Sequence, residues 1–515
     1  MKEQRWKTPL TYSVLALIIL LAVIFYLKQV NYDFINSTGD NYSYELIAQS
    51  VFSDHPFMIN VKFDYYDEHP IFHHQRSFPP LYPILLAFSH LLFGPGMYVV
   101  IYTAIGCAIF CAVPIFLTGR LLSNNQTGLL AALLTIFSLT LVRAAYLALS
   151  EPLFLLMSLW SLYFFLAYEE RKSYRDLALA ALFSGLAYLT RANGLAVVVA
   201  FSSYLLLKNS LPNQHTSWRR IGLELGSYLG ITLLVAAPWL ARNYLVFGDP
   251  FYYVGRFFAG LKPGMTYSGI FEQAPTLETF LTNTTWREIV SRYALSAVEH
   301  LKLIWKEISL LSVLAVSSLL LWRRFYVQLT ILWLYLCFNF VISLFHPYVY
   351  SRHIISLYPV LYLLAAFFVL NFKLVKPIYL FKGPLVPRIV LVLFFFAGAI
   401  ITIQQDLRSP LKLGAFSKVY APVGKWLRQN SPEDAVVMTN KTSPVAYHAN
   451  RQVVMLPLYV YPQTFDKMVK TFKVDYIVTM DYEDYVPPNF QKKWRSLIRF
   501  KNYNLGVFIY QRSGS

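Results

Sequence analysis

Apolar positions follow one another in long runs along most of this chain, and each run has roughly the length of a membrane-spanning helix. A bilayer core about 30 Å thick is crossed by about 20 apolar residues in an α-helix. Such runs lie near 9–28, 97–119, 126–142, 147–168, 176–190, 194–208, 221–241, 301–321, 326–345, 353–371 and 386–404. The pattern predicts a polytopic α-helical membrane protein with about 11 transmembrane helices.

One further apolar segment, 81–93, is shorter, follows Pro79-Pro80 and ends before Gly94-Pro95-Gly96. Whether it crosses is decided by the Lys and Arg residues, which concentrate in cytoplasmic loops. If 81–93 does not cross, most loop Lys and Arg fall on the same side as the N-terminus; if it crosses, every later loop is inverted. We therefore expect an interfacial or re-entrant helix and a cytoplasmic N-terminus.

Three larger segments then lie outside, near 29–96, 242–300 and 405–515. The last has short alternating runs at 435–439, 452–456 and 474–480, between helix-like stretches at 421–430 and 464–472. These patterns favour a small soluble α/β domain. The expected organisation is a transmembrane domain over 1–404 and an extracytoplasmic α/β domain over 405–515.

Composition agrees with a membrane protein. Of 515 residues, 56% are hydrophobic and 14% charged, whereas soluble domains have roughly 25% charged residues. The net charge of +18 comes from Lys and Arg beside apolar runs, which indicates anionic lipid headgroups rather than nucleic acid. Cys107, Cys111 and Cys337 all lie inside apolar runs, so neither a disulfide framework nor a Cys-based metal site is implied.

Ionisable residues near the ends of apolar runs are candidates for function, because charge is expensive inside a membrane. Several lie in the predicted outer loops or at the outer ends of spans: Asp40, Arg76, Glu151, Arg191, Arg242, His346, Arg352 and His353. The positive-inside rule accounts for basic residues on the cytoplasmic side but not for these. Their asymmetry predicts one site on the outer face.

Both acids have a structural and a functional interpretation. Asp40 begins a surface amphipathic helix, where it is either a plain N-cap or a general base for an acceptor hydroxyl. Glu151 lies between Ser150 and Pro152, a sequence that by itself explains a helix start. As an acid at the outer face, it is equally a candidate for the site.

The arginines of the predicted outer face also have structural or functional interpretations. Arg76 precedes the aromatic, proline-rich segment 77–83 and either binds a phosphate or extends to lipid headgroups. Arg191 lies in a very short turn that does not itself require an arginine, which favours function. Arg242 stands in an aromatic interfacial segment, which favours an anchor. Arg352 could neutralise a phosphate near a helix N-terminus.

Cofactor signals are few. His69 and His73 have a spacing seen in metal sites, in a loop that also holds Asp64, Asp67 and Glu68; the alternative is a solvated polar loop. The sequence has no Walker motif, no Gly-rich nucleotide loop and no Gly-x-Ser-x-Gly nucleophile elbow. The sequence therefore requires no cofactor, and the prediction of a divalent metal depends on the His69–His73 spacing alone. The energy for a reaction must come from the substrate.

Several short motifs occur in a fixed order over residues 30–360. They are Gly39-Asp40 with Tyr42 and Tyr44, Arg76-Ser77-Phe78-Pro79-Pro80-Leu81-Tyr82-Pro83, Ser150-Glu151-Pro152-Leu153-Phe154, Leu189-Thr190-Arg191-Ala192-Asn193-Gly194, Pro238-Trp239-Leu240-Ala241-Arg242-Asn243-Tyr244, and Arg352 followed by Pro359. In this order and with this topology, the chain resembles the GT-C glycosyltransferases, in the branch of protein O-mannosyltransferases and lipid A aminoarabinose transferases.

The resemblance implies transfer of a sugar from a polyprenyl-phosphate carrier to an acceptor hydroxyl on the extracytoplasmic face. It implies that Asp40 and Glu151 are catalytic, that the donor phosphate is bound by Arg76, Arg191, Arg352 and His353, and that substrate is bound by Tyr42, Tyr44, Tyr82, Arg242 and His346. The chain departs from many relatives at Asn41, where they have Glu, and at Phe78, where they have Lys.

We therefore expect an integral-membrane glycosyltransferase, in a bacterial inner membrane, whose partners are a lipid-linked sugar donor, a glycan, lipid or protein acceptor, and membrane lipids, with no nucleic acid. The alternatives are a lipid-linked sugar transporter or flippase and a non-catalytic envelope assembly protein. A transporter predicts polar residues through the bilayer midplane. A scaffold leaves the outer Asp, Glu and Arg residues unexplained.

Overall fold

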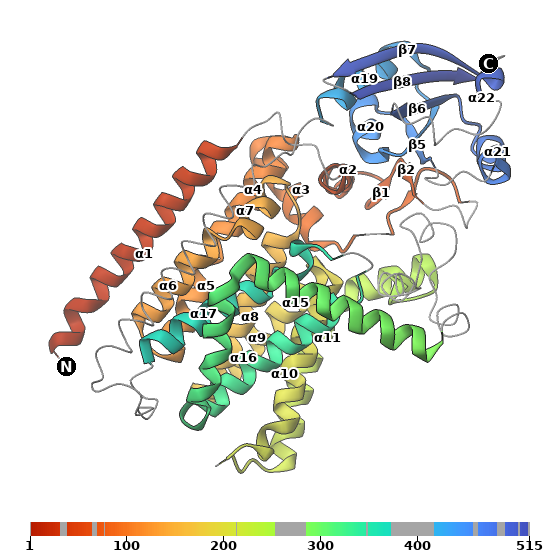
Figure 1. The fold of residues 1–515 in the computed structure, drawn as a ribbon. Helices are drawn as coiled ribbons and strands as arrows, with labels where there is room; N and C mark the ends of the chain where they lie inside the picture. Colours follow the sequence, from red (N-terminus) through yellow and green to blue (C-terminus); the bar gives the residue numbers. More distant parts are fainter. Residues whose placement is uncertain are drawn as a thin grey trace.

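The structure is a computed structural model that describes residues 2–30, 39–63, 69–76, 78–212, 214–252, 285–346, 349–371, 417–456, 462–480, 490–502 and 505–512. A bundle of long helices forms the larger part, and a smaller domain of strands and short helices stands at one end of it (Figure 1). We call the end of the bundle nearest this C-terminal domain the site face, and the other end the opposite face.

The helices coincide with the predicted apolar runs. The bundle contains α1 (Lys2–Gln29), α4 (Met97–Phe110), α5 (Ala112–Leu122), α6 (Asn125–Ile136), α7 (Leu139–Tyr146), α8 (Glu151–Arg171), α9 (Tyr174–Thr190), η2 (Ala192–Gly194), α10 (Leu195–Leu207), η3 (Lys208–Ser210), α11 (Trp218–Phe247), α15 (Trp286–Ser317), η4 (Ser318–Leu321), α16 (Trp322–Ser343), η5 (Ser351–Ile354) and α17 (Leu357–Asn371). The predicted run 386–404 lies outside the described residues. The polytopic helical fold is confirmed, and the number of spans stays a prediction.

Length and hydropathy give a stricter measure of which helices could cross a membrane. Among the described residues, six helical stretches are long and apolar enough, or seven if α6 and α7, which meet at 47°, form one bent span. One of the six, Trp286–Ser343, includes both α15 and α16. The shorter helix α17 has 15 residues, so it reaches a full membrane thickness only together with neighbouring segments.

The segment 81–93 forms α3 (Leu81–Phe93), a helix of 13 residues that packs against α2 (Asp40–Ser50) and α4. Its last turn exposes Leu91 and Leu92. The helix ends at Gly94, whose φ of 78° is readily adopted by glycine. A short helix with an exposed apolar end is typical of the membrane interface. The length of α3 therefore supports the expected interfacial placement, which stays a prediction.

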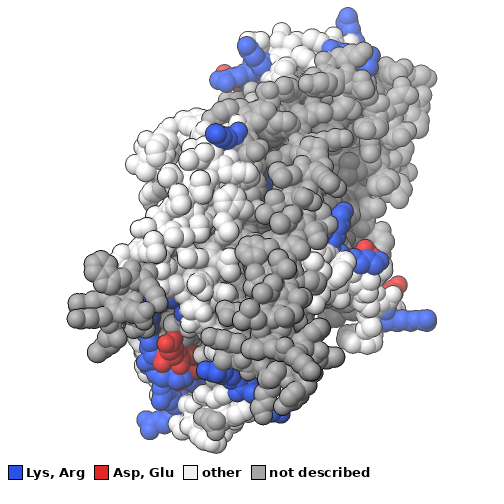
Figure 2. Space-filling model, turned by 60° about the vertical axis from the view of Figure 1, so that its left-hand side comes forward, with Lys and Arg blue, Asp and Glu red and all other residues white. Residues whose placement is uncertain are grey.

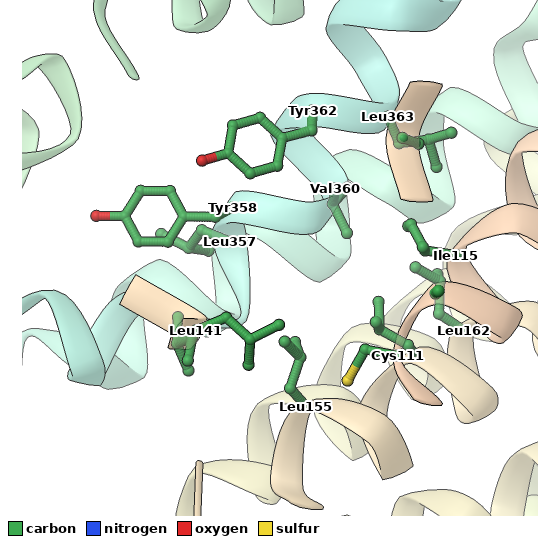
Figure 3. Packing of buried hydrophobic residues seen from close by; sticks show 14 of the residues in the cluster. Cys111, Ile115, Leu141, Leu155, Leu162, Leu357, Tyr358, Val360, Tyr362 and Leu363 are labelled. Carbon is green, nitrogen blue, oxygen red and sulfur yellow. The ribbon is translucent and has the colours of Figure 1, made fainter. Parts of the chain in front are cut away.

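Helix α17 lies inside the bundle. Every residue of α17 except Leu370 is buried, and the helix packs against α5, α6, α15 and α16. Figure 3 shows Val360 and Leu363 facing side chains of α5 and α8, such as Ile115 and Leu162, while the Tyr358 ring points away from them. A helix that is apolar on all sides is typical of such an interior position.

Glycines allow α5 and α6 to pack closely. A Cβ atom added at Gly119 would lie 2.6 Å from the Cα of Gly128, and one added at Gly128 would lie 2.3 Å from the carbonyl oxygen of Phe116. Small residues permit such close approach between helices in membranes. Any larger residue at Gly128 would push the two backbones apart.

The opposite face carries its own charged residues. Tyr12, near the start of α1, accepts a hydrogen bond of 2.5 Å from Arg120 at the end of α5. Lys208 and Arg220 both pair with Glu224 near the start of α11. Figure 2 shows blue Lys and Arg atoms and red Asp and Glu atoms gathered at the lower end of the molecule, below a surface where most described atoms are white. The distribution matches a membrane protein with charge at its two ends.

The C-terminal domain is an α/β domain, as predicted. Its elements are α19 (Ser417–Asn430), β4 (Val436–Thr439), α20 (Thr442–Ala449), β5 (Gln452–Met455), α21 (Pro462–Thr471), β6 (Tyr476–Met480), α22 (Phe490–Lys493), β7 (Trp494–Asn502) and β8 (Leu505–Arg512). Strands β4, β5 and β6 are parallel, and β8 and β7 extend the sheet antiparallel from β6. The predicted strands and helices of this segment are confirmed; the sequence analysis did not identify α20, α22, β7 or β8.

The first loop of the chain also belongs to this sheet. The loop contains β1 (Met58–Ile59) and β3 (His73–His74), which pair with each other in a separate antiparallel sheet, and β2 (Val61–Lys62), which joins the C-terminal sheet. Strand β2 pairs in parallel with β5, which makes the sheet order β2-β5-β4-β6-β8-β7. Residues of the 29–96 loop are therefore built into the C-terminal domain, which the sequence boundaries did not anticipate. The predicted boundary at 404/405 itself lies outside the described residues.

Candidate functional site

Asp40 is the first residue of α2, at the site face. The preceding residue, Gly39, is the N-cap and has φ of 75°, a left-handed conformation that glycine adopts without strain. The Asp40 side chain forms an ion pair with Arg352, with 3.0 Å between Oδ2 and Nη1, and is about one-third exposed, at 32%. The plain N-cap interpretation therefore does not describe Asp40, because Gly39 holds that position.

Glu151 lies next to this pair but is buried, with 1% of its side chain exposed. Its Oε1 lies 3.0 Å from Nη1 of Arg191 and 4.0 Å from Nε of Arg352. Neither carboxylate oxygen of Glu151 accepts a hydrogen bond of good geometry. Asp40, Arg352, Glu151 and Arg191 thus form one continuous chain of alternating charge, which we call the ionic network.

Ser150 precedes Glu151 but does not cap α8 with its side chain. Its hydroxyl instead lies 2.8 Å from the hydroxyl of Tyr44 and accepts a hydrogen bond of 3.2 Å from Arg191. A Ser-Glu-Pro helix start would explain these residues by local structure alone. Here the Ser150 and Glu151 side chains connect α2, α8 and the Arg191 turn, so the local explanation is incomplete.

Charge and burial set the protonation of groups around the ionic network. Burial lowers the pKa of Arg352, but Asp40 and Glu151 outweigh it and raise that pKa above its ordinary value. Burial raises the pKa of Tyr44, although Arg191 opposes the shift. Arg352 is therefore cationic and Tyr44 neutral across the physiological range.

The two histidines predicted for the site lie together. The rings of His346 and His353 stack with 3.9 Å between their centroids. Burial, with further contributions from Arg191 and Arg352, lowers the pKa of His346 to about 3. His346 is therefore neutral near the ionic network and does not add to its positive charge.

Tyr44 and Tyr82 form an aromatic wall behind the network. Their rings meet edge to face at 4.9 Å, and the ring of Phe78 lies 4.7 Å from that of Tyr44. The Tyr82 hydroxyl is directed to backbone carbonyls of Val100 and Ala148 at 3.3 Å. Tyr82 thus anchors the wall, and Tyr44 is the member whose hydroxyl contacts the network through Ser150.

Arg76 and Arg242 form a separate group at the C-terminal end of α11. Both guanidinium groups lie against the ring of Phe247, at 5.4 Å for Arg76 and 4.9 Å for Arg242, a cation–π arrangement. Arg242 also lies 4.6 Å from the ring of Trp239 and donates a hydrogen bond of 3.3 Å to the carbonyl of Gln75. The structure thus ties Arg76 and Arg242 to each other through one aromatic ring.

Tyr42, on the same helix as Asp40, is directed to the C-terminal domain. Its hydroxyl lies 3.1 Å from Nε2 of His448, and its ring packs at 5.2 Å against that of Tyr447. In this structure Tyr42 joins two domains, and a role in binding substrate stays a prediction.

Two acidic residues of the site region were missed by the sequence analysis. Glu307 of α15 accepts hydrogen bonds from Thr140, at 3.0 Å, and from Ser351, the neighbour of Arg352. It is the only acid in the run 301–321, a signal that could have identified it. Glu45 of α2 is fully buried and pairs with His90 of α3 at 3.0 Å, which fixes α2 on α3.

Metal ligands do not gather in the described part of the chain. Among these residues, no group of three or more His, Cys, Asp or Glu side chains is placed to hold a metal ion. Of the predicted polar loop, Asp64, Asp67 and Glu68 lie outside the described residues. His73 is described in β3, where its Nδ1 lies 2.8 Å from the carbonyl of Ile71.

Comparisons with known proteins concern part of the sequence and the overall fold. A family model described as dolichyl-phosphate-mannose-protein mannosyltransferase matches residues 77–241, which include Glu151 and Arg191 but not Asp40 or Arg352. A search of curated proteins gave no match.

Two solved structures align over almost the whole chain. The oligosaccharyltransferase AglB from Archaeoglobus fulgidus, in complex with an inhibitory peptide and a dolichol-phosphate, has a TM-score of 0.64 and 14% identity, covering 99% of this chain and 75% of AglB. ArnT from Cupriavidus metallidurans, bound to undecaprenyl phosphate, has a TM-score of 0.61 and 13% identity, covering 96% of this chain and 97% of ArnT. The chain therefore has the fold of the GT-C membrane glycosyltransferases.

Proposed function

We propose that this protein is an integral-membrane glycosyltransferase that moves a sugar from a polyprenyl-phosphate carrier to an acceptor hydroxyl. The observation that carries the proposal is the ionic network, in which one partly exposed carboxylate and two arginines meet at one end of a membrane bundle. Support comes from the fold, which AglB and ArnT share, and from the lipid phosphates present in those two structures.

Asp40 is the general base of the proposed reaction. Its carboxylate is partly exposed, so an acceptor hydroxyl can reach it, whereas Glu151 is buried. The acceptor oxygen forms a bond to the anomeric carbon while the bond from that carbon to the phosphate oxygen breaks. The acceptor proton passes to Asp40, and the bonding electron pair leaves with the polyprenyl phosphate.

Arg352 and Arg191 stabilise the departing phosphate. A guanidinium has five N–H donors, so an arginine can contact phosphate oxygens as well as its carboxylate partner. Such preorganised charge typically contributes about 10²–10³ in rate for a single donor group. The low dielectric beside the membrane strengthens this effect.

Glu151 is better suited to positioning than to contact with substrate. Its side chain is 1% exposed and lies between Arg191 and Arg352. A buried carboxylate between two guanidinium groups holds them together against their mutual repulsion. Within this proposal Glu151 sets the spacing of the two phosphate-binding groups.

The test uses the protein in lipid nanodiscs, incubated with a panel of polyprenyl-phosphate sugars and followed for released polyprenyl phosphate. We expect release with one class of sugar and none with Asp40→Asn. Absence of release with every donor, together with absence of donor binding, would reject the transferase and favour a transporter or an assembly protein.

The orientation has its own test. We propose that the site face is extracytoplasmic. A cysteine introduced as Pro95→Cys, between α3 and α4, should react with a membrane-impermeant maleimide in intact cells. Labelling only after the cytoplasm is opened would place the site face inside and invert the proposed topology.

A further inference from the structure

A pocket lies at the opposite face, among residues that the ionic network does not use. Its cavity volume is about 260 Å³. The wall is formed by three leucines of α5 and α8 and by polar side chains from α8, α16 and the segment before α11. The candidate membrane spans Met97–Leu122 and Glu151–Arg171 both end at this wall. We call it the opposite-face pocket, and it lies where the bundle leaves the membrane.

The charged side chains of the opposite-face pocket balance one another. Glu169 and Glu170 supply two negative charges, and Lys172 and Arg324 supply two positive charges. The described wall is therefore neutral as a whole but carries both signs of charge. A ligand with one cationic and one anionic group matches such a wall, whereas a ligand of a single sign meets like charge from two of the four side chains.

Glu169 is the buried acid of this wall, with 2% of its side chain exposed. Its Oε2 accepts hydrogen bonds from the ammonium group of Lys172, at 2.5 Å, and from the hydroxyl of Tyr204, at 2.9 Å. Its Oε1 is buried and accepts no hydrogen bond from the described residues. A buried carboxylate oxygen without a donor is uncommon in a native protein. A ligand that brings an N–H donor into the pocket would satisfy it.

The backbone of Lys172 favours its pairing with Glu169. Lys172 follows the last residue of α8 and has φ of 54° and ψ of 32°, a left-handed conformation that is usual for glycine at a helix end and strained for a residue with a side chain. In this conformation its ammonium group pairs with Glu169 and lies 5.8 Å from the ring of Tyr168. Lys172 is thus engaged by the wall itself, and Arg324 is the other cation that a ligand can meet.

Arg324 and Glu170 lie at the rim of the opposite-face pocket, where both are exposed. Within the described part of the chain, neither forms an ion pair; the guanidinium of Arg324 lies 6.0 Å from the ring of Phe325. Gln214 and Gln328, which are half-buried, also line the pocket and add amide N–H donors. The pocket therefore offers donors for an anion and acceptors for a cation.

We propose that the opposite-face pocket binds the headgroup of a phospholipid that carries a phosphate and a primary ammonium group. Arg324 and the side-chain amides of Gln214 and Gln328 donate hydrogen bonds to the phosphate. Glu170 and Oε1 of Glu169 accept hydrogen bonds from the ammonium group, which has three N–H donors. The three leucines contact the glycerol end of the lipid.

The size and place of the pocket favour this occupant. Small-molecule sites have volumes of about 300–1,000 Å³, so a slightly smaller pocket suits a small headgroup rather than a nucleotide or a glycan. Its position at the ends of two membrane spans gives a lipid direct access. A choline headgroup lacks N–H donors for the two glutamates, and a glycerol headgroup lacks the positive charge.

The test uses the purified protein in detergent micelles, without any sugar donor. The dioleoyl forms of phosphatidylethanolamine, phosphatidylcholine and phosphatidylglycerol are added at equal concentration, and native mass spectrometry measures the Kd of each retained lipid. We expect phosphatidylethanolamine to bind about tenfold more tightly than the other two, and Arg324→Gln and Glu170→Gln each to raise its Kd about tenfold. Free phosphoethanolamine at the same concentration should not compete, because it lacks the part that contacts the leucines.

The matched control is Arg323→Gln, at the exposed neighbour of Arg324 that does not line the pocket, and it should keep the Kd of wild type. Equal Kd values for the three lipids, or an unchanged Kd in Arg324→Gln, would overturn the proposal. Equal losses in Arg323→Gln and Arg324→Gln would also overturn it, because they would reduce the effect to general attraction between charges. Competition by free phosphoethanolamine would replace the lipid with a soluble ligand.

A charge reversal gives a result that loss of folding cannot imitate. Glu170→Lys leaves one acid and three cations in the described wall, a net charge of +2. This variant should bind phosphatidylglycerol more tightly than phosphatidylethanolamine. A retained preference for phosphatidylethanolamine would overturn the assignment of Glu170 to the ammonium group. None of these measurements requires turnover, so their outcome is separate from that of the glycosyltransferase proposal.

Discussion

Two buried glutamates, one at each end of the bundle, are each paired with two cations and yet are built differently. Glu224, at the opposite face, accepts hydrogen bonds from Lys208 and from Arg220, which is four residues away on its own helix. Glu151, at the site face, lies beside Arg191 and Arg352 from distant parts of the chain but accepts no hydrogen bond of good geometry.

The difference teaches how a structural ion pair can be distinguished from a site in one molecule. Glu224 is buried and accepts hydrogen bonds from both of its cationic partners. Breaking such a pair lowers the stability of the fold. Glu151 lies beside two guanidinium groups without accepting a hydrogen bond of good geometry, which suits the positioning role that the proposed function gives it. Both glutamates are buried and paired with cations. They differ in the geometry of their hydrogen bonds.

The largest expected effect is that of Asp40→Asn. Loss of the proposed base should lower the rate of polyprenyl-phosphate release by about 10²–10⁴, with an unchanged thermal unfolding midpoint. Asp176→Asn, which alters a carboxylate paired with Arg171 at the opposite face, is the control and should keep its turnover. Equal turnover in Asp40→Asn and wild type would remove Asp40 from the chemistry.

Arg352→Ala should come next, with a loss of about 10²–10³ in kcat/KM for the lipid-linked donor. Arg352→Lys should recover part of this loss, because a lysine keeps the charge but not the planar pair of donors. Steady-state kinetics at varied donor concentration provide the measurement. A kcat/KM for the donor that does not depend on residue 352 would rule out phosphate binding there.

The two glutamates themselves give the sharpest comparison. Glu151→Gln should lower turnover by about 10²-fold and should cost less stability than the change at Glu224, because Arg191 and Arg352 are 17% and 33% exposed and water can solvate them, whereas Lys208 is 2% exposed. Glu224→Gln should leave turnover intact but lower the free energy of unfolding by about 3 kcal/mol, because Lys208 then remains buried without its counter-charge. Turnover assays and thermal unfolding followed by tryptophan fluorescence measure both quantities. The same outcome for both variants would erase the distinction between the two ends.

A smaller effect concerns His448 at the seam between α2 and α20. Burial lowers the pKa of His448 to about 4, below its ordinary value of about 6.5. Between these values the unfolded chain binds more protons, so stability rises with pH through this window and is lost as the pH falls toward 4. His448→Gln should therefore show a smaller fall in unfolding midpoint from pH 7 to pH 5 than wild type. Identical falls would mean that His448 is not the group involved.

The sequence predicted the helical architecture because apolar runs and the positions of Lys and Arg report directly on a membrane. It also singled out all four residues of the ionic network, because acids and arginines at the ends of apolar runs are unusual. It did not show that Asp40 meets Arg352, since that pairing joins residues 312 positions apart and no local pattern encodes it.

Other residues show why the remaining features could not be predicted. The strand β2 has two residues, too few for an alternating pattern, and its partner β5 lies in the tail. Arg76 and Arg242 were read separately, whereas the ring of Phe247 between them becomes visible only in three dimensions.

The insertion of β2 into the C-terminal sheet sets an order on biosynthesis. Asn60 and its hydrogen-bond partner Arg451 are 391 residues apart along the chain, so the ribosome produces the first loop long before the strand that completes it. Until the tail has been synthesised and folded, α2 lacks its contacts with the C-terminal domain and Asp40 lacks a fixed position. Under the proposed function, sugar transfer therefore requires the finished polypeptide, and a prematurely terminated chain is expected to be inactive.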